Sequence, residues 1–530
     1  MNFETIIGLE VHVHLLTNSK MFCRCSADYA GSLPNTHVCP VCLGMPGVLP
    51  VINQKAIEYT AMTALALNCS ISEYTRFDRK NYPYPDLMKG YQISQYEAPI
   101  GHDGWIYIEV NGNKKRAGIT RVHLEEDVAK LLHRTSPSGE TYSLVDVNRS
   151  GVPMMEIVGE PDLHSPEEAR QYLMKLRSIL RYIGVSTASM EEGGFRCDAN
   201  VSIRPEGSVE STPKVEIKNM NSFLAVYRSL ELEIQRQKKA VEAGKKLIQE
   251  TRGWVEERGI TVSQRSKEYA DDYRYFPEPD LPPLTLSQDW VEKIRSKLPE
   301  LPEAKRERFM KEYGLLPYDA NLLTSTREMA NYFEDCLITV TNEENQKKYV
   351  ATYKDEELNK LLKETKPGKV PERLKNEIFN WLMGEQISKG AKEISNWLLG
   401  EVSRIMNAND IDINEFRERV SPKELIELIV YSHNRINIAT AKSVLEEMFN
   451  TGKTSLDIIS KQGLDQISDS TAIEMEVIAT IDNNQAAVAD YKAGKEQALK
   501  FLVGQVMKAT RGRANPQLVN ELLKKKLEEK

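Results

Sequence analysis

The sequence predicts an α+β fold, in which a domain built on antiparallel strands precedes an all-helical domain and a small helical tail domain. Segments that alternate apolar and polar residues recur up to about residue 280, and this period is typical of half-buried antiparallel strands. A proline-rich stretch at 276–283 closes this region, and helical patterning follows it. We therefore expect domains at 1–293, 294–462 and 463–530, with an insertion around 341–390 in the second.

The first domain combines strands with amphipathic helices. Its clearest alternating segments are 7–15, 119–125, 195–204 and 214–218. The sequence SPEE at 165–168 matches a capping box with proline at the first helical position, and it predicts a helix that ends at Gly184. A second helix is expected from Ser222 to about Ala243, before a glycine that can terminate it.

The polar faces of these strands carry His, carboxylate, Asn and Arg, whereas a solvated face usually carries Thr, Ser, Lys and Glu. Glu10 and His12 lie two residues apart on one strand, so both can reach one hard cation, and Glu125 can complete the set. Asp198 and Asn200 share the polar face of a third strand. These five residues are the catalytic candidates, although the strand pattern alone fits an ordinary wet sheet face equally well.

Basic residues stand beside tyrosine and proline in two predicted loops, 78–86 and 271–277. Such stiffened loops suit the binding of a nucleotide or an RNA end, but the pattern alone favours simply packed turns. Together with the strand faces, they give a set of candidate residues for binding ATP or substrate: Arg79, Lys80, Tyr82, Lys89, Gln92, Ser94, Arg196, Arg204, Lys218 and Arg274.

Four of the seven cysteines form a metal-binding pattern, with Cys23 and Cys25 followed after thirteen residues by Cys39 and Cys42. The spacing and the nearby Pro and Gly residues predict a structural zinc site, in preference to free or redox-active thiols. With four thiolates as ligands, no coordination position stays open for a substrate. The N-terminal segment has no basic region before its apolar stretch, and no apolar run approaches a membrane span, so we expect a cytoplasmic protein with no membrane partner.

Charge is unevenly distributed along the chain. The net charge is −7 overall, but residues 490–530 hold ten Lys or Arg and five Asp or Glu, a net of +5. A basic module on an acidic body can confine RNA contact to that module. Its candidate tRNA-binding residues are Lys508, Arg511, Arg513, Lys524, Lys525 and Lys526.

Nucleotide-binding motifs of the familiar kinds do not occur. The sequence has neither a complete phosphate-binding loop nor a dinucleotide-binding glycine pattern after a strand. It also shows no glycine- and serine-rich amidase signature and no cysteine in a recognisable glutaminase context. If the protein uses ATP, the polar sheet must hold it together with a metal ion.

Long stretches of the chain, in order and almost end to end, resemble the B-subunit family of the aspartyl/glutamyl-tRNA(Asn/Gln) amidotransferases. They include IIGLEVHVHL, FDRKNYPYPDLMKGYQISQYEAPI, GITRVHLEEDVAK, LVDVNRSGVPMMEIV, MEEGGFRCDANVSIRP, VEIKNMNSF, DDYRYFPEPDLPPL and KFLVGQVMKATRGRANPQLVNELL. The resemblance implies that the first domain is the family's cradle domain. It also implies a heterotrimer with an amidase A subunit and a small C subunit, in which the A subunit releases ammonia from glutamine.

The resemblance further implies an ATP-dependent ligase (EC 6.3.5.-) of protein biosynthesis. The B subunit would phosphorylate the side-chain carboxylate of Glu-tRNA(Gln), Asp-tRNA(Asn) or both, and ammonia channelled from the A subunit would displace the phosphate. Glu10, His12 and Glu125 match the family's magnesium-binding positions. Zinc cysteines occur in only part of the family, so zinc is not expected to take part in the chemistry. The alternative is a non-catalytic, tRNA-binding scaffold subunit, which would not need the Glu10, His12 and Glu125 face.

Overall fold

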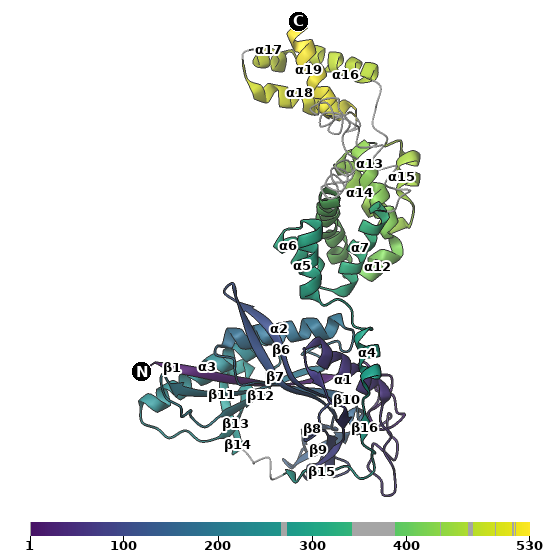
Figure 1. The fold of residues 1–530 in the computed structure, drawn as a ribbon. Coiled ribbons are helices and arrows are strands. Elements are labelled where there is room, and N and C mark those ends of the chain that lie inside the picture. Colours follow the sequence, from purple (N-terminus) through teal and green to yellow (C-terminus); the bar gives the residue numbers. More distant parts are fainter. Residues whose placement is uncertain are drawn as a thin grey trace, which may run out of the picture. The chain divides into compact units, whose positions relative to one another are not determined.

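The computed structural model describes residues 2–266, 273–341, 387–434, 436–464, 470–492, 494–510, 514 and 516–529. The chain divides into two compact units, Met1–Pro302 and Glu303–Lys530. The first unit is a mixed α/β domain and the second is helical, as the sequence predicts (Figure 1).

A nine-stranded sheet forms the body of the first unit. Its strands follow the order β14-β13-β12-β11-β1-β10-β7-β6-β2, and every neighbouring pair is antiparallel except β12 and β13. The strands are β1 (Phe3–His14), β2 (Ser70–Ile71), β6 (Gly101–Val110), β7 (Asn113–Glu126), β10 (Pro153–Gly159), β11 (Phe195–Pro205), β12 (Val215–Lys218), β13 (Glu250–Val255) and β14 (Ile260–Ser266). The four clearest alternating segments of the sequence correspond to β1, β7, β11 and β12.

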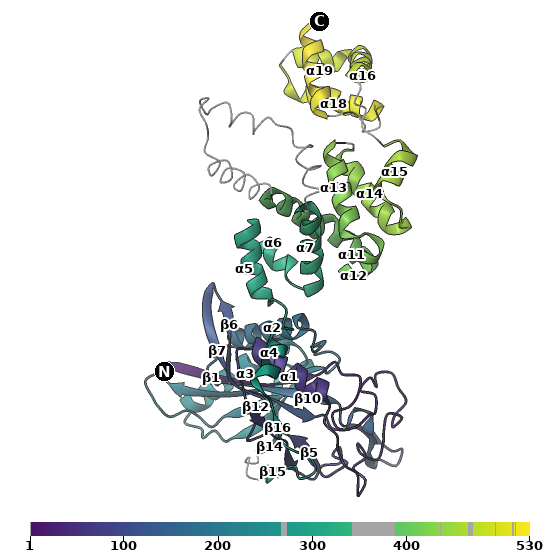
Figure 2. The same ribbon diagram turned by 45° about the vertical axis from the view of Figure 1, so that its right-hand side comes forward.

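Helices cover the apolar face of this sheet. Helices α1 (Gln54–Ala66), α2 (Pro166–Tyr182) and α3 (Phe223–Glu242) contribute to one hydrophobic core with alternate residues of the strands, such as Leu9 and Val11 of β1. Helix α4 (Gln288–Arg295) packs on α1 (Figure 2). Since successive strand residues point to opposite faces, Glu10 and His12 project from the other face, away from this core.

The two predicted helices form, but the capping box at α2 is only half made. Ser165 accepts a hydrogen bond from the backbone N–H of Glu168, as a cap should. The Glu168 carboxylate accepts from the N–H of His164 at 2.7 Å and pairs with Lys115 at 2.5 Å, instead of reaching the N–H of Ser165. The lysine on β7 engages this carboxylate, a tertiary contact that the local sequence does not show.

Smaller sheets flank the main one. The segment 78–86, expected to be a loop, begins with strand β4 (Asp78–Asn81), which pairs with β5 (Tyr91–Ser94) and β15 (Phe276–Pro277). Two further pairs join β3 (Tyr74–Thr75) to β16 (Leu284–Thr285) and β8 (Lys130–Thr135) to β9 (Thr141–Asp146), and β9 leads into the 3₁₀ turn η1 (Val147–Arg149). A second turn, η2 (Glu256–Arg258), joins β13 to β14.

The second unit contains helices around two hydrophobic clusters. One cluster is formed by residues between Phe309 and Ile459, and the other by residues between Ile473 and Leu527. The described elements are α5 (Pro302–Tyr313), α6 (Pro317–Leu323), α7 (Arg327–Thr341), the π-helix η4 (Leu398–Val402), α11 (Ser403–Asn409), α12 (Ile413–Arg419), α13 (Pro422–Asn434), α14 (Ile438–Thr451), α15 (Ser455–Gln462), α16 (Ser470–Asn483), α17 (Gln485–Lys492), α18 (Glu496–Ala509) and α19 (Pro516–Glu529). Most of the expected insertion at 341–390 lies outside the described residues. None of the helices that the structure describes combines the length and apolar character needed to cross a membrane.

Candidate functional site

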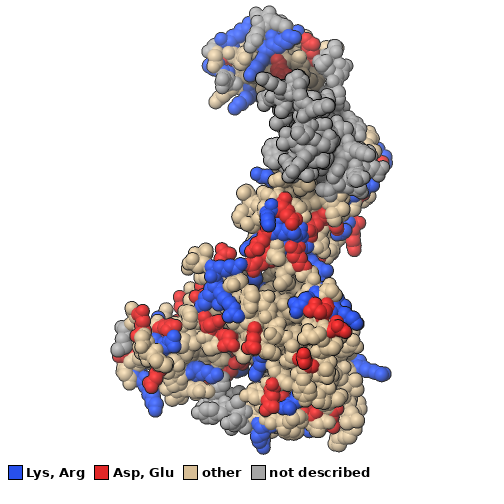
Figure 3. All heavy atoms as spheres, in the orientation of Figure 1, with Lys and Arg blue, Asp and Glu red and all other residues tan. Residues whose placement is uncertain are grey.

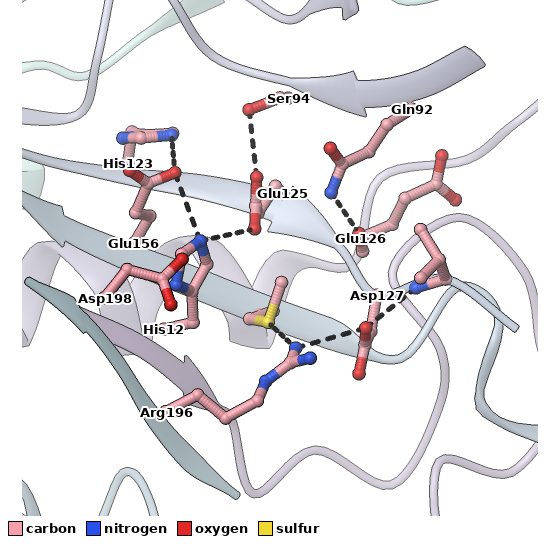
Figure 4. Close-up of polar contacts among 12 residues, drawn as sticks. His12, Gln92, Ser94, His123, Glu125, Glu126, Asp127, Glu156, Arg196 and Asp198 are labelled. Atoms are coloured by element: carbon pink, nitrogen blue, oxygen red, sulfur yellow. Dashed lines mark hydrogen bonds and ion pairs between the residues drawn. The ribbon is translucent and has the colours of Figure 1, made fainter. Parts of the chain in front are cut away.

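Strand register gathers polar side chains from β7, β10, β1 and β11 into one patch on the sheet face opposite the core. Residues at paired positions of neighbouring strands point to the same face. The central row contains His123, Glu156, His12 and Arg196, and the rows beside it contain Arg121, Val158, Glu10 and Asp198, and Glu125, Met154 and His14. Residues far apart in the sequence thus meet in a single site (Figure 4).

Three of these side chains form a candidate metal site. His12, Glu125 and Glu156 offer ligand atoms that all lie within 4.8 Å of one another. The Nε2 atom of His12 is 3.6 Å from Glu125 Oε1 and 3.6 Å from Glu156 Oε2. Two carboxylates and one imidazole suit a hard divalent cation, and three protein ligands leave coordination positions for water and phosphate oxygens. The residues present therefore fit a magnesium ion.

Glu156 is the member of this group that sequence reasoning missed. It is a lone charged residue in β10, whose other residues are apolar or glycine, and that isolation was the available signal. Glu10 lies in the neighbouring row, where its carboxylate accepts a hydrogen bond from Asn200 at 2.8 Å, and it is not part of the group of three donors. Asp198 pairs with Lys218 at 2.5 Å beside it.

Charges within the patch balance one another. Burial by itself lowers the pKa of His12, but the carboxylates of Glu156 and Glu125 outweigh it and raise that pKa to about 9. Burial favours the neutral form of Glu156, yet His123 and His12 hold its pKa well below the usual value. An imidazolium thus offsets the carboxylate charge, and a divalent cation bound here would release that proton.

The small sheet contributes a second group of predicted residues to this site. The ammonium group of Lys80 lies over the rings of Tyr82 and Tyr273, at 5.8 and 5.0 Å from their centroids. Burial lowers the pKa of Lys80, but the nearby Tyr275 and Glu125 groups more than compensate and raise it. A cation held between aromatic rings and carboxylates is suited to binding an anion that bridges to a metal ion.

Strand β5 supplies two polar neighbours of the acidic end of β7. Ser94 donates to Glu125 at 3.4 Å, and Gln92 donates to the backbone carbonyl of Glu126 at 2.8 Å. Both residues were predicted to bind ATP or substrate, and both lie beside the candidate metal group (Figure 4).

Other predicted binding residues have their partners outside the central cluster. Arg79 binds both carboxylate oxygens of Glu278, at 2.7 and 2.8 Å, and so helps to hold the small sheet together. Arg204 pairs with Glu4, near the far end of β1. Lys89 pairs with the buried Glu126 carboxylate. The backbone carbonyl of Arg274 accepts a hydrogen bond from Asn81.

The four predicted zinc ligands also come together. The sulfur atoms of Cys23, Cys25, Cys39 and Cys42 lie within 4.8 Å of one another, and none forms a disulfide. A hydrogen bond from the Cys23 thiol is the main reason why the pKa of Cys42 falls to about 5. Four soft donors at this spacing fit tetrahedral zinc.

The loop between the two cysteine pairs is fixed to the segment around η1. The side chain of Asn148 accepts from the N–H of His37 at 2.8 Å and donates to the carbonyl of Leu33 at 2.8 Å. Lys20, which is buried, donates to the carbonyl oxygens of His37 and Val147. The loop between the cysteine pairs is thus hydrogen-bonded to the turn η1, which ends at Arg149.

The basic C-terminal helices place their predicted cations differently. Lys508, Lys524 and Lys525 are exposed, whereas Lys526 pairs with Glu474 of α16 at 2.8 Å. Arg511 and Arg513 lie outside the described residues. Lys and Arg side chains gather on the visible face of these helices (Figure 3).

Comparisons with known proteins match nearly the whole chain. A family model described as the GatB/GatE catalytic domain matches residues 5–292, and one described as the GatB domain matches residues 379–527. The B subunit of the aspartyl/glutamyl-tRNA(Asn/Gln) amidotransferase of Dehalococcoides mccartyi is 56% identical over 528 residues, with 99% of each chain covered. Proteins of the same name from Carboxydothermus hydrogenoformans and Thermomicrobium roseum are 49% and 50% identical, and each comparison covers at least 99% of both chains. The chain therefore belongs to the family of the B subunits of aspartyl/glutamyl-tRNA(Asn/Gln) amidotransferases, which are glutamine-dependent carbon–nitrogen ligases.

Proposed function

We propose that this chain is the catalytic B subunit that activates the side-chain carboxylate of Glu-tRNA(Gln), Asp-tRNA(Asn) or both with ATP. The observation that carries the proposal is the convergence of His12, Glu125 and Glu156 on one point of the sheet, within 4.8 Å of one another. Glu10 belongs to the proposed magnesium site from the neighbouring row, and Asp198 and Asn200 surround it.

The reaction requires a good leaving group on a poor electrophile. An oxygen of the substrate carboxylate attacks the γ-phosphorus of ATP, the bond from that phosphorus to the bridging oxygen breaks, and ADP leaves. Magnesium bound by His12, Glu125 and Glu156 would neutralise charge on the transferring group. The N–H groups of Lys80 and Arg196 donate hydrogen bonds to phosphate oxygens. Ammonia then forms the new C–N bond, phosphate departs with the acyl oxygen, and the surplus proton leaves the nitrogen.

Other parts of the assembly are proposed on the same basis. The relatives are named as B subunits, and such a name denotes one chain of several. We therefore propose an amidase A subunit as the source of channelled ammonia and a small C subunit as the third chain. The basic tail binds tRNA, the four cysteines bind a structural zinc ion, and the complex works in the cytoplasm. A pure scaffold would gain nothing from burying two carboxylates beside a histidine at a cost in desolvation.

An ATP hydrolysis assay with aminoacyl-tRNA tests the proposal. In the assembled enzyme with Mg²⁺, we expect Glu-tRNA(Gln) or Asp-tRNA(Asn) to stimulate ATP hydrolysis, and His12→Ala and Glu125→Ala to abolish it. Glutamine hydrolysis by the A subunit, measured without tRNA, should survive in both variants, and the trimer should stay assembled. Near-normal amidation by either variant would favour the scaffold alternative.

A further inference from the structure

The acidic run that ends β7 sends its three carboxylates to different partners. Glu125 faces His12, Glu126 pairs with Lys89, and Asp127, which is only 1% exposed, belongs to neither group. A buried carboxylate is costly unless hydrogen bonds and opposite charges compensate it, so the partners of Asp127 indicate what it does.

Three basic side chains share the Asp127 carboxylate. Its Oδ2 atom accepts a hydrogen bond from His14 Nε2 at 2.7 Å and lies 3.4 Å from Arg149 Nε. Its Oδ1 atom accepts from Arg196 Nη2 at 3.2 Å and from the backbone N–H of Val128 at 2.8 Å. Two arginines, a histidine and a backbone N–H therefore surround this one carboxylate.

The group formed by Asp127, Arg149 and Arg196 keeps a net positive charge after its ion pairs form. Two guanidinium groups face the one carboxylate. Arg149 directs its other hydrogen bonds to the carbonyl oxygens of Val128 and Ala129, which fixes it in the fold. Arg196 differs, because its Nε and Nη1 atoms have no hydrogen-bond partner in the described part of the chain and its side chain is 41% exposed.

Strand register places Arg196 beside the metal cluster. Arg196 is the β11 partner of His12, in the row that also contains Glu156 (Figure 4). Met154 and Asp127 both contact its Nη2 atom, which leaves its other N–H groups for an anion. The contrast with Arg79 is informative, because Glu278 there takes two nitrogens in a bidentate pair.

We infer that Asp127 is a positioning residue, which fixes Arg196 so that the remaining N–H groups of its guanidinium bind phosphate oxygens of the nucleotide beside His12, Glu125 and Glu156. The inference rests on the proposed function. Without Asp127, an exposed arginine on a strand samples many rotamers, and it must give up that freedom each time it binds phosphate. The Asp127 carboxylate removes most of this entropic cost in advance.

Steady-state kinetics of the assembled enzyme test the inference, with aminoacyl-tRNA-dependent ATP hydrolysis as the readout. Arg196→Met should raise the KM for ATP about tenfold or more, as expected for the loss of hydrogen bonds between charged groups. Asp127→Asn should reproduce most of that increase. The double variant should be no worse than Arg196→Met alone, because both changes remove the same interaction.

A matched control separates positioning from stability. Glu233→Gln removes another buried carboxylate, which binds Arg236 in a bidentate pair on the helix α3 side of the sheet. This variant should lower the melting temperature and leave the KM for ATP unchanged. If Asp127→Asn does not assemble, Asp127→Glu takes its place with the same expected outcomes, since its extra methylene shifts the carboxylate from the position in which it contacts Arg196.

Two outcomes would overturn the inference. One is an Asp127 variant that only loses stability, as the Glu233 variant should, while the KM for ATP stays normal. The other is a double variant whose effects multiply, because independent residues behave in that way. If His12→Ala also left ATP hydrolysis intact, the proposed function would fail. If His12→Ala abolished hydrolysis while Arg196→Met and Asp127→Asn kept a normal KM, only the positioning role would fail.

Discussion

At the scale of single residues, Glu10 and Glu156 differ in how their neighbours are brought to them. Glu10 was predicted as a metal ligand because it lies two residues from His12, which along a strand means a separation of about 7 Å. Glu156 lies opposite His12 on the neighbouring strand, where paired residues are only about 5 Å apart. The sequence predicts which side chains share a face, but the pairing of β1 with β10 depends on contacts between distant segments.

The same register makes Glu156 a direct test of the metal site. We expect Glu156→Gln, which keeps the shape and removes the charge, to raise the Mg²⁺ concentration needed for half-maximal ATP hydrolysis by about 10- to 100-fold. Glu125→Gln should act similarly, because both carboxylates face His12 Nε2. Glu4→Gln is the control, since Glu4 lies on β1, the strand of His12, and pairs with Arg204 at the surface. An unaltered Mg²⁺ requirement in Glu156→Gln would remove this residue from the site.

At the scale of elements, local patterns predicted what depends on local physics. Helix α3 begins after Ser222, whose side chain caps the N–H of Ala225, and the strands with clear alternation form as expected. Strand β4 was missed because the prolines that follow it favoured a loop; it pairs with the nearby β5 and with β15, almost two hundred residues further along the chain. No local signal distinguishes a proline-rich turn from a short strand that a distant segment completes.

The cluster of Cys23, Cys25, Cys39 and Cys42 is an element whose role can be separated from the chemistry. We expect about one zinc ion per chain, and the double variant Cys39→Ser, Cys42→Ser should lose it and melt at a lower temperature. Its amidation rate, measured well below that temperature, should change little, because a closed four-thiolate site leaves no position for substrate. Zinc content by elemental analysis and Tm by calorimetry provide the two readouts. A variant that kept its Tm and lost amidation would show that the cysteine cluster acts in the reaction itself.

At the scale of the whole molecule, the sequence divides its charge between a body and a tail. Residues 490–530 carry a net charge of +5 within a chain of net charge −7. Not all of these cations are available, since Lys526 pairs with Glu474 and helps to join α19 to α16. Composition predicts the sign of a surface, whereas the pairing of individual lysines depends on how the helices pack.

Deletion of residues 463–530 should therefore weaken the binding of aminoacyl-tRNA and leave the reacting site in place. We expect a higher KM for aminoacyl-tRNA, a smaller change in the maximal rate, and unchanged glutamine hydrolysis without tRNA.

Charge reversal at Arg511 and Arg513 should lower the slope of log affinity against log salt concentration by about 2, roughly one for each phosphate contact. The control reverses Lys453 and Lys461, which are exposed and lie outside the deleted segment, and so makes the same change in net charge. Because non-specific attraction depends on total charge while contacts depend on position, an equal loss of affinity in both double variants would reduce the tail to a general electrostatic effect. Unchanged affinity after the deletion, at low and moderate salt, would exclude the tail from tRNA binding.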